Sequence, residues 1–305
     1  MMNTRQKEEL IGLAGKNIRF HCPMAEHTTF SVGGKAEALY EACDMEGLKR
    51  VLAYIGKERI PYMALGRGSN ILVKDDGLEG VVILLGGSLS RIEKSESDEI
   101  SVLAGAGLSL ADLLSYCSRS GLGGLEFLSG IPGTVGGAVA MNAGAFGEEI
   151  AARVRKIHII DKQGNLVVKD RSSELKFSYR KLDLEKGSVI VRALFRLTRE
   201  AEGAVGRKIL YYLKRKKESQ PLGYPSAGSV FKNPPGDYAG RLIEKAGLKG
   251  TKMGGAVISE KHANYILNTG GAKAKDILDL MYLAQETVKK ETGIQLETEI
   301  RIVGK

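Results

Sequence analysis

The stretch that decides the fold is Gly121–Gly147, GLGGLEFLSGIPGTVGGAVAMNAGAFG. It holds nine glycines and one charged residue, Glu126, and most of its other side chains are apolar. Glycine loses much backbone entropy on folding and has no side chain to pack, so this composition suits a backbone that approaches a bulky ligand or a phosphate. Backbone N–H groups of such a loop can hold an anion without a lysine. A tightly packed strand–turn–helix junction is the alternative interpretation.

The rest of the chain has the composition of a globular protein. Its 305 residues are 43% hydrophobic and 27% charged, which predicts two or three domains with their own cores. A net charge of +9 suits polyanionic partners such as nucleotides, nucleic acid or an anionic membrane. The sequence has three scattered cysteines, no signal-peptide pattern, no membrane-spanning apolar run and no metal-ligand spacing, so we expect a cytoplasmic protein without a metal.

Periodicity and capping residues predict the main elements. Helices are expected over 4–14, 45–59, 110–119, 205–218, 237–246 and 273–291, and strands over 154–161, 166–169, 189–197, 256–258, 265–267 and 299–303, with a charged turn over 93–99. Strands 154–161 and 166–169 are expected to form a hairpin. The regular βαβ rhythm of a doubly wound sheet is absent, which predicts an α+β fold.

Standard nucleotide fingerprints are missing from the chain. Neither G-x-x-x-x-G-K-[ST] nor G-x-G-x-x-G occurs, which disfavours a Rossmann-type site. A different candidate is Gly66–Asn70, GRGSN, which follows one predicted strand and precedes Ile71-Leu72-Val73. Its small residues with free N–H groups form a plausible nest for a pyrophosphate, and a plain tight turn is the alternative.

A second candidate for chemistry is PSAGSVFKNP, residues 225–234. Ser229 on this turn is placed to donate a proton, and Lys232 and Asn233 follow closely enough to hold an anionic substrate. A loop closed by two prolines is the alternative. The segment lacks the G-x-S-x-G pattern, so hydrolase chemistry is not indicated.

Glu299 lies near the carboxyl end of the chain in an alternating pattern. Period two places Glu299 on one face with Glu297 and Arg301, while Ile300 and Ile302 face the core. A carboxylate beside a buried face can orient or polarise a reacting group. A solvated edge strand is the alternative.

Two basic segments complete the candidates. Tyr179 and Arg180, expected after a short helical stretch, offer a phenol and a guanidinium suited to a carboxylate or phosphate, or they are an ordinary surface pair. Residues 207–217, RKILYYLKRKK, have an apolar stripe and charged faces, which favours a solvated helix over a nucleic-acid site.

Four segments together resemble one enzyme family. Residues 124–145, GLEFLSGIPGTVGGAVAMNAGA, resemble the flavin-binding signature of UDP-N-acetylenolpyruvoylglucosamine reductases. GRGSNILV at 66–73, PSAGSVFKNP at 225–234 and LETEIRIVG at 296–304 are similar to further segments of that family, in the same order. The resemblance spans nearly the whole chain.

The resemblance implies a fold and a domain division. Residues 33–199 would form a two-lobed FAD-binding region of the non-Rossmann, vanillyl-alcohol-oxidase-like type, with a lobe boundary near residue 80. Residues 1–32 would be a lead-in, 200–298 a smaller α+β substrate domain, and 299–305 a final strand that carries a catalytic glutamate. The chain passes from Gly187 into the next strand without a long tyrosine-bearing insertion, which suggests the family's second, short-loop form.

The resemblance also implies site residues. The expected FAD contacts are Gly66, Arg67, Gly68, Ser69, Asn70, Ile71, Pro132, Gly133, Thr134, Gly136, Gly137, Asn142 and Gly144. The expected catalytic residues are Arg180, Ser229 and Glu299, with Tyr179, Lys232 and Asn233 contacting the substrate. His262 lies in KHANYILN, another segment similar to the family, and both a place near the flavin and a packing role stay open.

The activity implied is the reduction of an enolpyruvyl UDP-sugar to UDP-N-acetylmuramate for peptidoglycan. NADPH would reduce the FAD, and hydride would pass from it to C3 of the enolpyruvyl group. Arg180 and Glu299 would stabilise the enolate, and Ser229 would protonate C2. No nucleic acid, membrane insertion or obligate protein partner is expected. Two alternatives are another oxidase of the wider flavin family and a basic nucleic-acid-binding protein.

Overall fold

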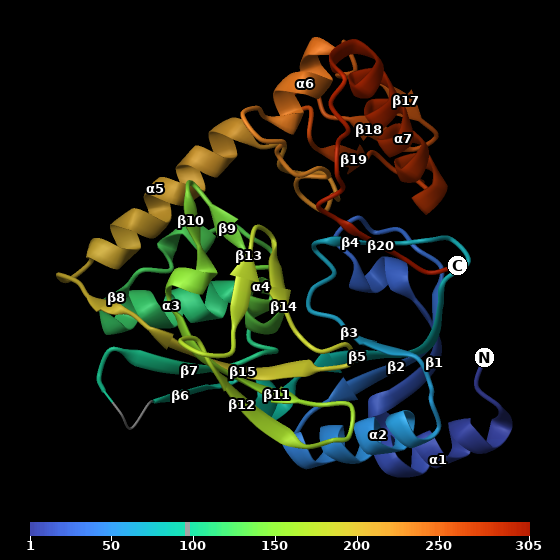
Figure 1. Ribbon diagram of the computed structural model, residues 1–305, viewed down its shortest axis with the longest axis vertical. Helices are drawn as coiled ribbons and strands as arrows, with labels where there is room; N and C mark the ends of the chain where they lie inside the picture. Colours follow the sequence, from blue (N-terminus) through green and yellow to red (C-terminus); the bar gives the residue numbers. More distant parts are fainter. Residues whose placement is uncertain (95–97) are drawn as a thin grey trace. The chain divides into compact units, whose positions relative to one another are not determined.

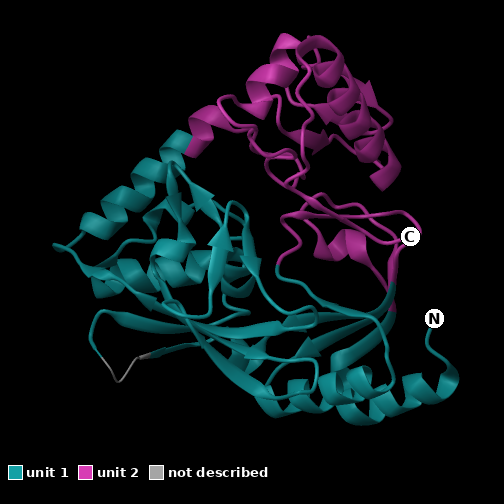
Figure 2. Cartoon of the chain, viewed as in Figure 1, with its two compact units in different colours: residues 1–20, 37–66, 79–215 teal, residues 21–36, 67–78, 216–305 magenta. Residues whose placement is uncertain are grey.

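The chain divides into two units, which are coloured separately in Figure 2. The computed structural model describes residues 1–94 and 98–305, so residues 95–97 of the charged turn expected over 93–99 lie outside the described residues. Unit 1 comprises residues 1–20, 37–66 and 79–215, and unit 2 comprises residues 21–36, 67–78 and 216–305. Each unit is therefore assembled from segments that lie far apart in the sequence.

The first layer of unit 1 is built on a four-stranded sheet and two helices. The sheet has the order β1-β2-β5-β3, with β1 at Ile18–Pro23, β2 at Lys35–Ala42, β5 at Leu78–Leu85 and β3 at Tyr62–Ala64. Figure 1 shows α1 (Thr4–Ala14) and α2 (Met45–Lys57) side by side along this sheet. Asn3 caps α1 in a capping box, and the Asp44 carboxylate caps α2 as predicted.

The second layer of unit 1 is a five-stranded sheet of order β12-β11-β15-β7-β6. Its strands are β6 (Ile92–Lys94), β7 (Ser101–Gly105), β11 (Val154–Ile160), β12 (Leu166–Asp170) and β15 (Val189–Arg196). The antiparallel pairing of β11 with β12 confirms the predicted hairpin. Helices α3 (Leu110–Ser120) and α4 (Val135–Ala140) pack on this sheet through a shared core that includes Leu113, Val139 and Phe195.

Short strand pairs occupy the edges of unit 1. They are β8 (Leu122–Gly123) with β16 (Thr198–Arg199), β9 (Gly144–Ala145) with β10 (Glu148–Glu149), and β13 (Lys176–Ser178) with β14 (Lys181–Asp183). The expectation of a short helix before Tyr179 was wrong, because residues 171–174 form a turn that leads into β13. The β13–β14 hairpin instead places Tyr179 and Arg180 at its tip.

Unit 2 packs two helices and short strands around a core of its own. Its elements are α6 (Ala239–Lys245), α7 (Ala274–Thr292), the sheet β17 (Lys252–Met253), β18 (Ala256–Ile258) and β19 (Ile266–Asn268), and the parallel pair β4 (Ile71–Val73) and β20 (Arg301–Val303). The core joins Phe30 and Leu72 to α7 residues such as Ile277. Helix α5 (Ala204–Ser219) contributes residues 204–215 to unit 1 and its last turn to unit 2.

The end of the chain differs from the expected strand. β20 begins at Arg301, so Glu299 lies in the bend before it. Ile300 is buried as expected, but the prediction that Ile302 faces the core was wrong, because its side chain is 36% exposed. β20 pairs with β4 in a two-stranded sheet, and both Arg301 and Ile302 are exposed. The mixture of helices with largely antiparallel sheets agrees with the predicted α+β class.

No helix in residues 1–94 or 98–305 is both long enough and apolar enough to span a bilayer.

Candidate active site

The two loops predicted to hold a dinucleotide meet in unit 1 at Gly66 and Thr134. A Cβ atom on Gly66 would lie 2.6 Å from the Thr134 hydroxyl oxygen, so only glycine fits at position 66 without a shift. Thr134 caps α4, because its hydroxyl accepts from Gly137 N–H at 3.4 Å. The loop is fastened to its neighbour by Leu110 N–H donating to the Gly133 carbonyl at 3.0 Å.

The glycine pair at the start of α4 serves two different purposes. A Cβ on Gly136 would come within 2.8 Å of the Ala106 Cβ, so this glycine is required by packing within the protein. A Cβ on Gly137 would meet only the Thr134 hydroxyl, at 3.5 Å, and otherwise open space. Contacts among the described residues therefore do not explain Gly137, and its predicted contact with the cofactor stays a prediction. These residues fit the FAD that the motif implies.

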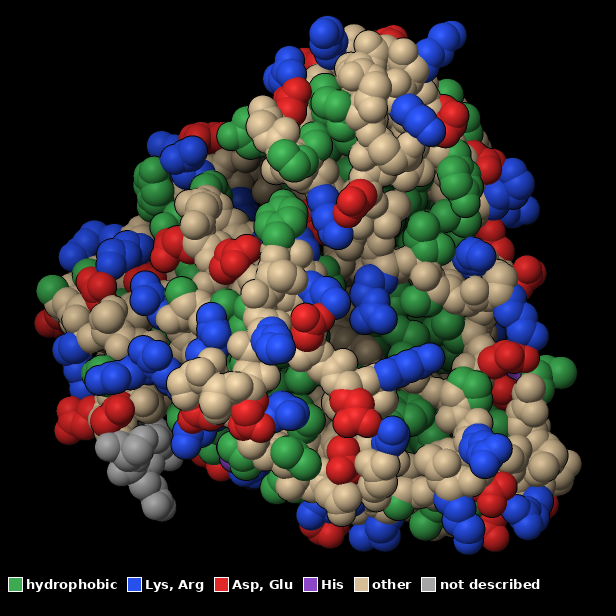
Figure 3. Space-filling view, in the orientation of Figure 1, with side chains coloured by type: hydrophobic (Ala, Val, Ile, Leu, Met, Phe, Trp, Pro, Cys, Tyr) green, Lys and Arg blue, Asp and Glu red, His purple; other side chains and the backbone are tan. Residues whose placement is uncertain are grey.

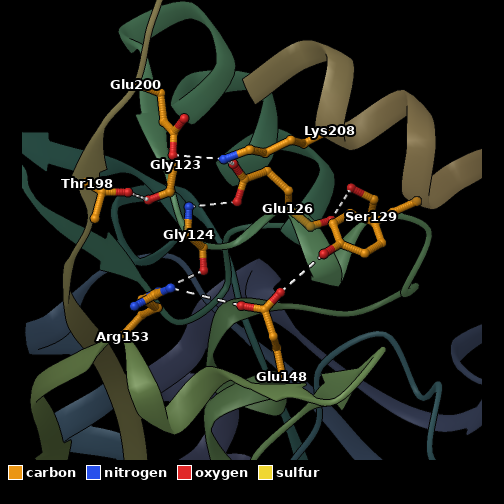
Figure 4. A network of polar contacts seen from close by, with 10 residues as sticks. Gly123, Gly124, Glu126, Ser129, Glu148, Arg153, Thr198, Glu200 and Lys208 are labelled. Atoms are coloured by element: carbon orange, nitrogen blue, oxygen red, sulfur yellow. Dashed lines mark hydrogen bonds and ion pairs between the residues drawn. The ribbon is translucent and has the colours of Figure 1, made fainter. Parts of the chain in front are cut away.

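Polar side chains form a network around the first half of the glycine stretch, residues 121–130, as Figure 4 shows. Glu126 is only 5% exposed, and its carboxylate accepts from Gly124 N–H at 2.6 Å. Arg153 donates through Nε to the Gly124 carbonyl at 3.0 Å, and Thr198 donates to the Gly123 carbonyl at 3.1 Å. The glycines of this half are thus held by side chains of the protein itself.

The same network holds helix α5 against the rest of unit 1. Lys208 of α5 donates to Glu200 at 2.8 Å and lies 3.8 Å from the second carboxylate oxygen of Glu126. That oxygen is buried and accepts no hydrogen bond within the described residues. Burial, with a further contribution from the charge of Glu126, raises the pKa of the Cys117 thiol to about 12. Glu126 and Cys117 are therefore buried in this part of unit 1, whereas the Lys208 side chain is half exposed.

Asn142 lies in the second half of the stretch, shortly after α4, and is 1% exposed. Its amide nitrogen donates to a Glu149 carboxylate oxygen at 2.7 Å and to the Ser178 carbonyl at 3.0 Å. Its amide oxygen accepts from Ala151 N–H at 3.2 Å. Both amide hydrogens are therefore used within the protein, which leaves the backbone of Asn142 as its means of contacting a cofactor.

Arg180 is presented by the β13–β14 hairpin, in which Ser178 pairs with Lys181. Tyr179 and Arg180 are the two turn residues, and Arg180 has a left-handed backbone with φ of 59°. Such a conformation is uncommon for arginine and is found at functional sites. The guanidinium lies 4.9 Å from the Tyr179 ring centroid, in cation–π geometry.

In unit 2, the remainder of the GRGSN loop reaches the end of the chain. Gly68 has φ of +63°, and a Cβ there would lie 2.2 Å from the His27 carbonyl oxygen. The Asn70 side chain donates to the Glu299 carbonyl at 3.1 Å, and Arg301 N–H donates to the Asn70 carbonyl at 3.0 Å. Ile71 is buried in β4, so its side chain serves the core.

Ser229 and Glu299 lie on neighbouring segments of unit 2. Glu299 N–H donates to the Val230 carbonyl at 2.8 Å, directly after Ser229. On the other side, Asn264 exchanges two hydrogen bonds with Phe231, accepting at 2.9 Å and donating at 2.8 Å. The serine-bearing segment is therefore held between the Glu299 bend and Asn264.

Tyr265 connects the two candidate catalytic groups of unit 2. It shares a side-chain hydrogen bond with Ser229, and burial, together with the nearby charge of Glu299, raises the pKa of its phenol to about 12. His262 packs edge-on against the Tyr265 ring at 4.9 Å. Burial lowers the pKa of the His262 imidazole, which keeps it neutral near pH 7.

A cavity of about 340 Å³ opens beside Ser229 in unit 2. Its lining includes Asn233, Arg241, Lys261 and His262, which are donors suited to a phosphate-bearing ligand. Asn233 also accepts from Ala239 N–H at 3.1 Å. Lys232 is paired with Glu297 at 3.2 Å, so contact with a substrate would require it to exchange that partner.

The predicted residues thus fall into two groups. Gly66, residues 132–144, Tyr179 and Arg180 belong to unit 1, and Arg67–Ile71, Ser229, Lys232, Asn233 and Glu299 belong to unit 2. The convergence of Arg180 with the other two catalytic candidates stays a prediction. Asn264 and Tyr265 were missed, although both lie in KHANYILN, the segment singled out only for His262.

The described residues offer little evidence for a nucleic-acid site or a metal site. On the face drawn in Figure 3, lysine and arginine side chains are interspersed with acidic ones rather than gathered into one patch. Among the residues that the structure describes, no three His, Cys, Asp or Glu side chains cluster as a metal site.

Comparisons with known proteins cover almost the entire chain. Residues 36–169 match the FAD binding domain family, and residues 220–303 match the family of the UDP-N-acetylenolpyruvoylglucosamine reductase C-terminal domain. The UDP-N-acetylenolpyruvoylglucosamine reductase of Caldanaerobacter subterraneus subsp. tengcongensis is 44% identical, over 92% of both chains. That of Halalkalibacterium halodurans is 42% identical, over 97% of this chain and 98% of the relative. The crystal structure of the Thermus caldophilus enzyme superposes with a TM-score of 0.81 at 38% identity, covering 92% of this chain and 97% of that one.

Proposed function

The chain belongs to the UDP-N-acetylenolpyruvoylglucosamine reductase family, and from this premise we propose its activity. It catalyses the NADPH-dependent, FAD-mediated reduction of the enolpyruvyl group of UDP-N-acetylglucosamine-enolpyruvate to give UDP-N-acetylmuramate for peptidoglycan. The observation that carries the proposal is the match along 92% of both chains. The placement of Ser229 against the Glu299 bend supports it from the structure.

The cofactor contacts follow from the two glycine loops. Residues 33–199 form the FAD-binding region and residues 200–298 the substrate domain in this proposal. Gly66, Gly137, the Thr134 turn and Arg67–Ile71 contact the dinucleotide. Pro132, Gly133, Gly136 and Gly144 shape the first loop, and Asn142 contributes through its backbone. FAD, when bound, supplies the transfer of hydride between NADPH and the substrate.

The protein's own groups handle the charge and the proton. Hydride addition at C3 of the enolpyruvyl group builds negative charge at C2 that is delocalised into the carboxylate. Arg180 stabilises that charge, and Glu299 does so in its protonated form. The Ser229 hydroxyl donates the proton to C2, and its hydrogen bond with Tyr265 orients it. Tyr179, Lys232 and Asn233 contact the substrate.

Location and subtype are part of the same proposal. We place the enzyme in the cytoplasm, where NADPH and UDP-sugars are available. The short passage from Gly187 into β15 supports the short-loop form of the family.

The decisive experiment is NADPH oxidation by the FAD-loaded protein, with and without the enolpyruvyl UDP-sugar. Substrate-dependent turnover is expected. Ser229→Ala should retain flavin reduction by NADPH and lose turnover by about 10²- to 10⁴-fold, because only the proton-transfer step is removed. Flavin absorbance reports the two half-reactions separately.

Ser226→Ala, three residues upstream on the same segment, is the matched control and should keep normal turnover. Rapid oxygen-dependent oxidation with no response to the UDP-sugar would instead indicate an oxidase. A colourless protein with salt-sensitive binding to nucleic acid would contradict a flavoenzyme altogether. Intact turnover in Ser229→Ala would exclude the serine as the proton donor.

A further inference from the structure

Asn142 connects three segments of unit 1 that are separate in the sequence. Its own segment follows α4, its Glu149 partner lies in β10, and its Ser178 partner ends β13. Asn142 has φ of 43°, a left-handed conformation that asparagine tolerates better than most residues. The bond to Glu149 is 2.7 Å long, as expected when the acceptor is a carboxylate.

The Ser178 carbonyl is a significant point of attachment. Ser178 is the last strand residue before the Tyr179–Arg180 turn. The hairpin has only three residues in each strand and pairs with no third strand, and such ribbons are marginal without outside support. Leu182 packs into the core of unit 1, and the bond from Asn142 holds the opposite strand beside the turn.

The backbone after Asn142 also touches Arg180. A Cβ on Gly144 would lie 3.2 Å from the Arg180 guanidinium nitrogen Nη1 and 2.5 Å from the Glu148 carbonyl oxygen. Gly144 pairs with Glu149, the carboxylate that Asn142 holds. The guanidinium therefore rests on a strand whose position depends on the same asparagine.

We propose that Asn142 is a positioning residue for the proposed reaction, which sets the Arg180 guanidinium through the Ser178 carbonyl and the Gly144 strand. This role rests on the proposed function of Arg180 and is separate from the backbone contact with FAD proposed for Asn142. The asparagine acts on the half-reaction in which the substrate accepts hydride, and leaves FAD retention and NADPH oxidation largely unaffected.

The test compares Asn142→Gly, Arg180→Ala and the double variant in the FAD-loaded protein. Glycine keeps the left-handed backbone and removes only the amide. We expect Asn142→Gly to lower kcat by about ten- to hundredfold, as for a misplaced catalytic group, with flavin reduction by NADPH within about twofold of normal. The double variant should be no slower than Arg180→Ala alone, because the asparagine acts through the arginine.

Of two further variants, one should slow turnover and the other should not. Asn142→Asp should be at least as slow as Asn142→Gly, because it sets a carboxylate against Glu149 and the Ser178 carbonyl. Asn165→Gly is the matched control, since Asn165 is an exposed turn residue of the same unit and should leave turnover unchanged. Full activity in Asn142→Asp would overturn the proposal.

Hydrogen exchange gives a readout that does not need turnover. Amides of residues 176–183 should exchange faster in Asn142→Gly, while those of β15 stay as in the parent protein. The proposal would be overturned if the exchange of these amides is unchanged, or if loss of FAD is the main defect. It would also be overturned if Asn142→Gly slows turnover equally with and without Arg180. If the parent protein shows no turnover with the UDP-sugar, the proposed function fails, and hydrogen exchange alone still decides the role of Asn142.

Discussion

The two halves of the glycine stretch look alike in sequence and differ in what their glycines contact. In residues 121–130, the Gly123 and Gly124 carbonyls and the Gly124 N–H are bonded by protein side chains. In residues 132–147, Gly137 faces open space and the chain turns through Asn142 toward the Arg180 hairpin. Gly123 and Gly124 serve contacts within the protein, whereas Gly137 leaves room that the proposed cofactor would use.

This difference shows why glycine content alone is an ambiguous signal. The packing alternative holds for Gly124, whose φ is +115° and whose Cβ position lies 2.6 Å from Arg153 Nε. The ligand interpretation suits Gly137, where a Cβ finds room. We therefore expect substitutions in the first half to lower folding stability and Gly137 substitutions in the second half to lower affinity for the cofactor.

The largest effect is expected in the first half. Glu126→Ala should lower the free energy of unfolding of the FAD-free protein by about 2 kcal/mol, because it leaves the Gly124 N–H without its buried acceptor and removes the ion pair with Lys208. Urea unfolding measures this. Glu200→Ala, which removes a more exposed partner of Lys208, should cost less than about 1 kcal/mol. If the two variants are equally stable, the polar network does not hold this half together.

A smaller effect that sharpens the comparison is expected at Gly137. Gly137→Ala should keep or raise the stability of the FAD-free protein, because alanine favours a helix more than glycine does, and should weaken FAD binding at least about tenfold. Flavin fluorescence titration measures the affinity. Gly136→Ala is the control. Unlike Gly137→Ala, it should lower the stability of the FAD-free protein, because its Cβ would meet Ala106. Unchanged FAD affinity in Gly137→Ala would remove the distinction between the halves.

The smallest effect at neutral pH concerns Cys117, beside the first half. Its folded pKa is about 12 against a reference of 9.0, so the unfolded thiol loses its proton first and stability should fall as pH rises from 9 toward 12. Cys117→Ala should flatten this fall in pH-dependent unfolding. Cys117 should also resist alkylation at pH 8 while the half-buried Cys43 reacts. Rapid modification of Cys117 in the folded protein would contradict the burial of this thiol.

Much of the secondary structure could be predicted because local signals determine it. The starts of α2 at Met45 and of α3 at Leu110 and the β11–β12 hairpin are read from neighbouring residues, and the structure confirms all three. The Ile302 prediction was wrong because alternation assumes that one face of the strand is covered, whereas the successive residues Arg301 and Ile302 of β20 are both exposed.

The candidate site was predictable only in part. Family motifs led to Ser229 and Glu299, but the contacts that hold their segments come from Asn264, Tyr265 and Asn70. These partners are distant in the chain, so no local pattern identifies them. For the same reason, the engagement of Gly123 and Gly124 by Thr198 and Arg153 could not be anticipated from glycine spacing.

The parallel pairing of β4 with β20 has a consequence for synthesis of the protein. Asn70, at the edge of β4, bonds to Glu299, which is 229 residues later in the chain. Translation proceeds at about 5–20 residues per second, so β4 leaves the ribosome about ten seconds or more before its partner exists. Unit 2 therefore completes its fold only after β20 has been synthesised, and a nascent chain that stops before Arg301 has no partner for β4.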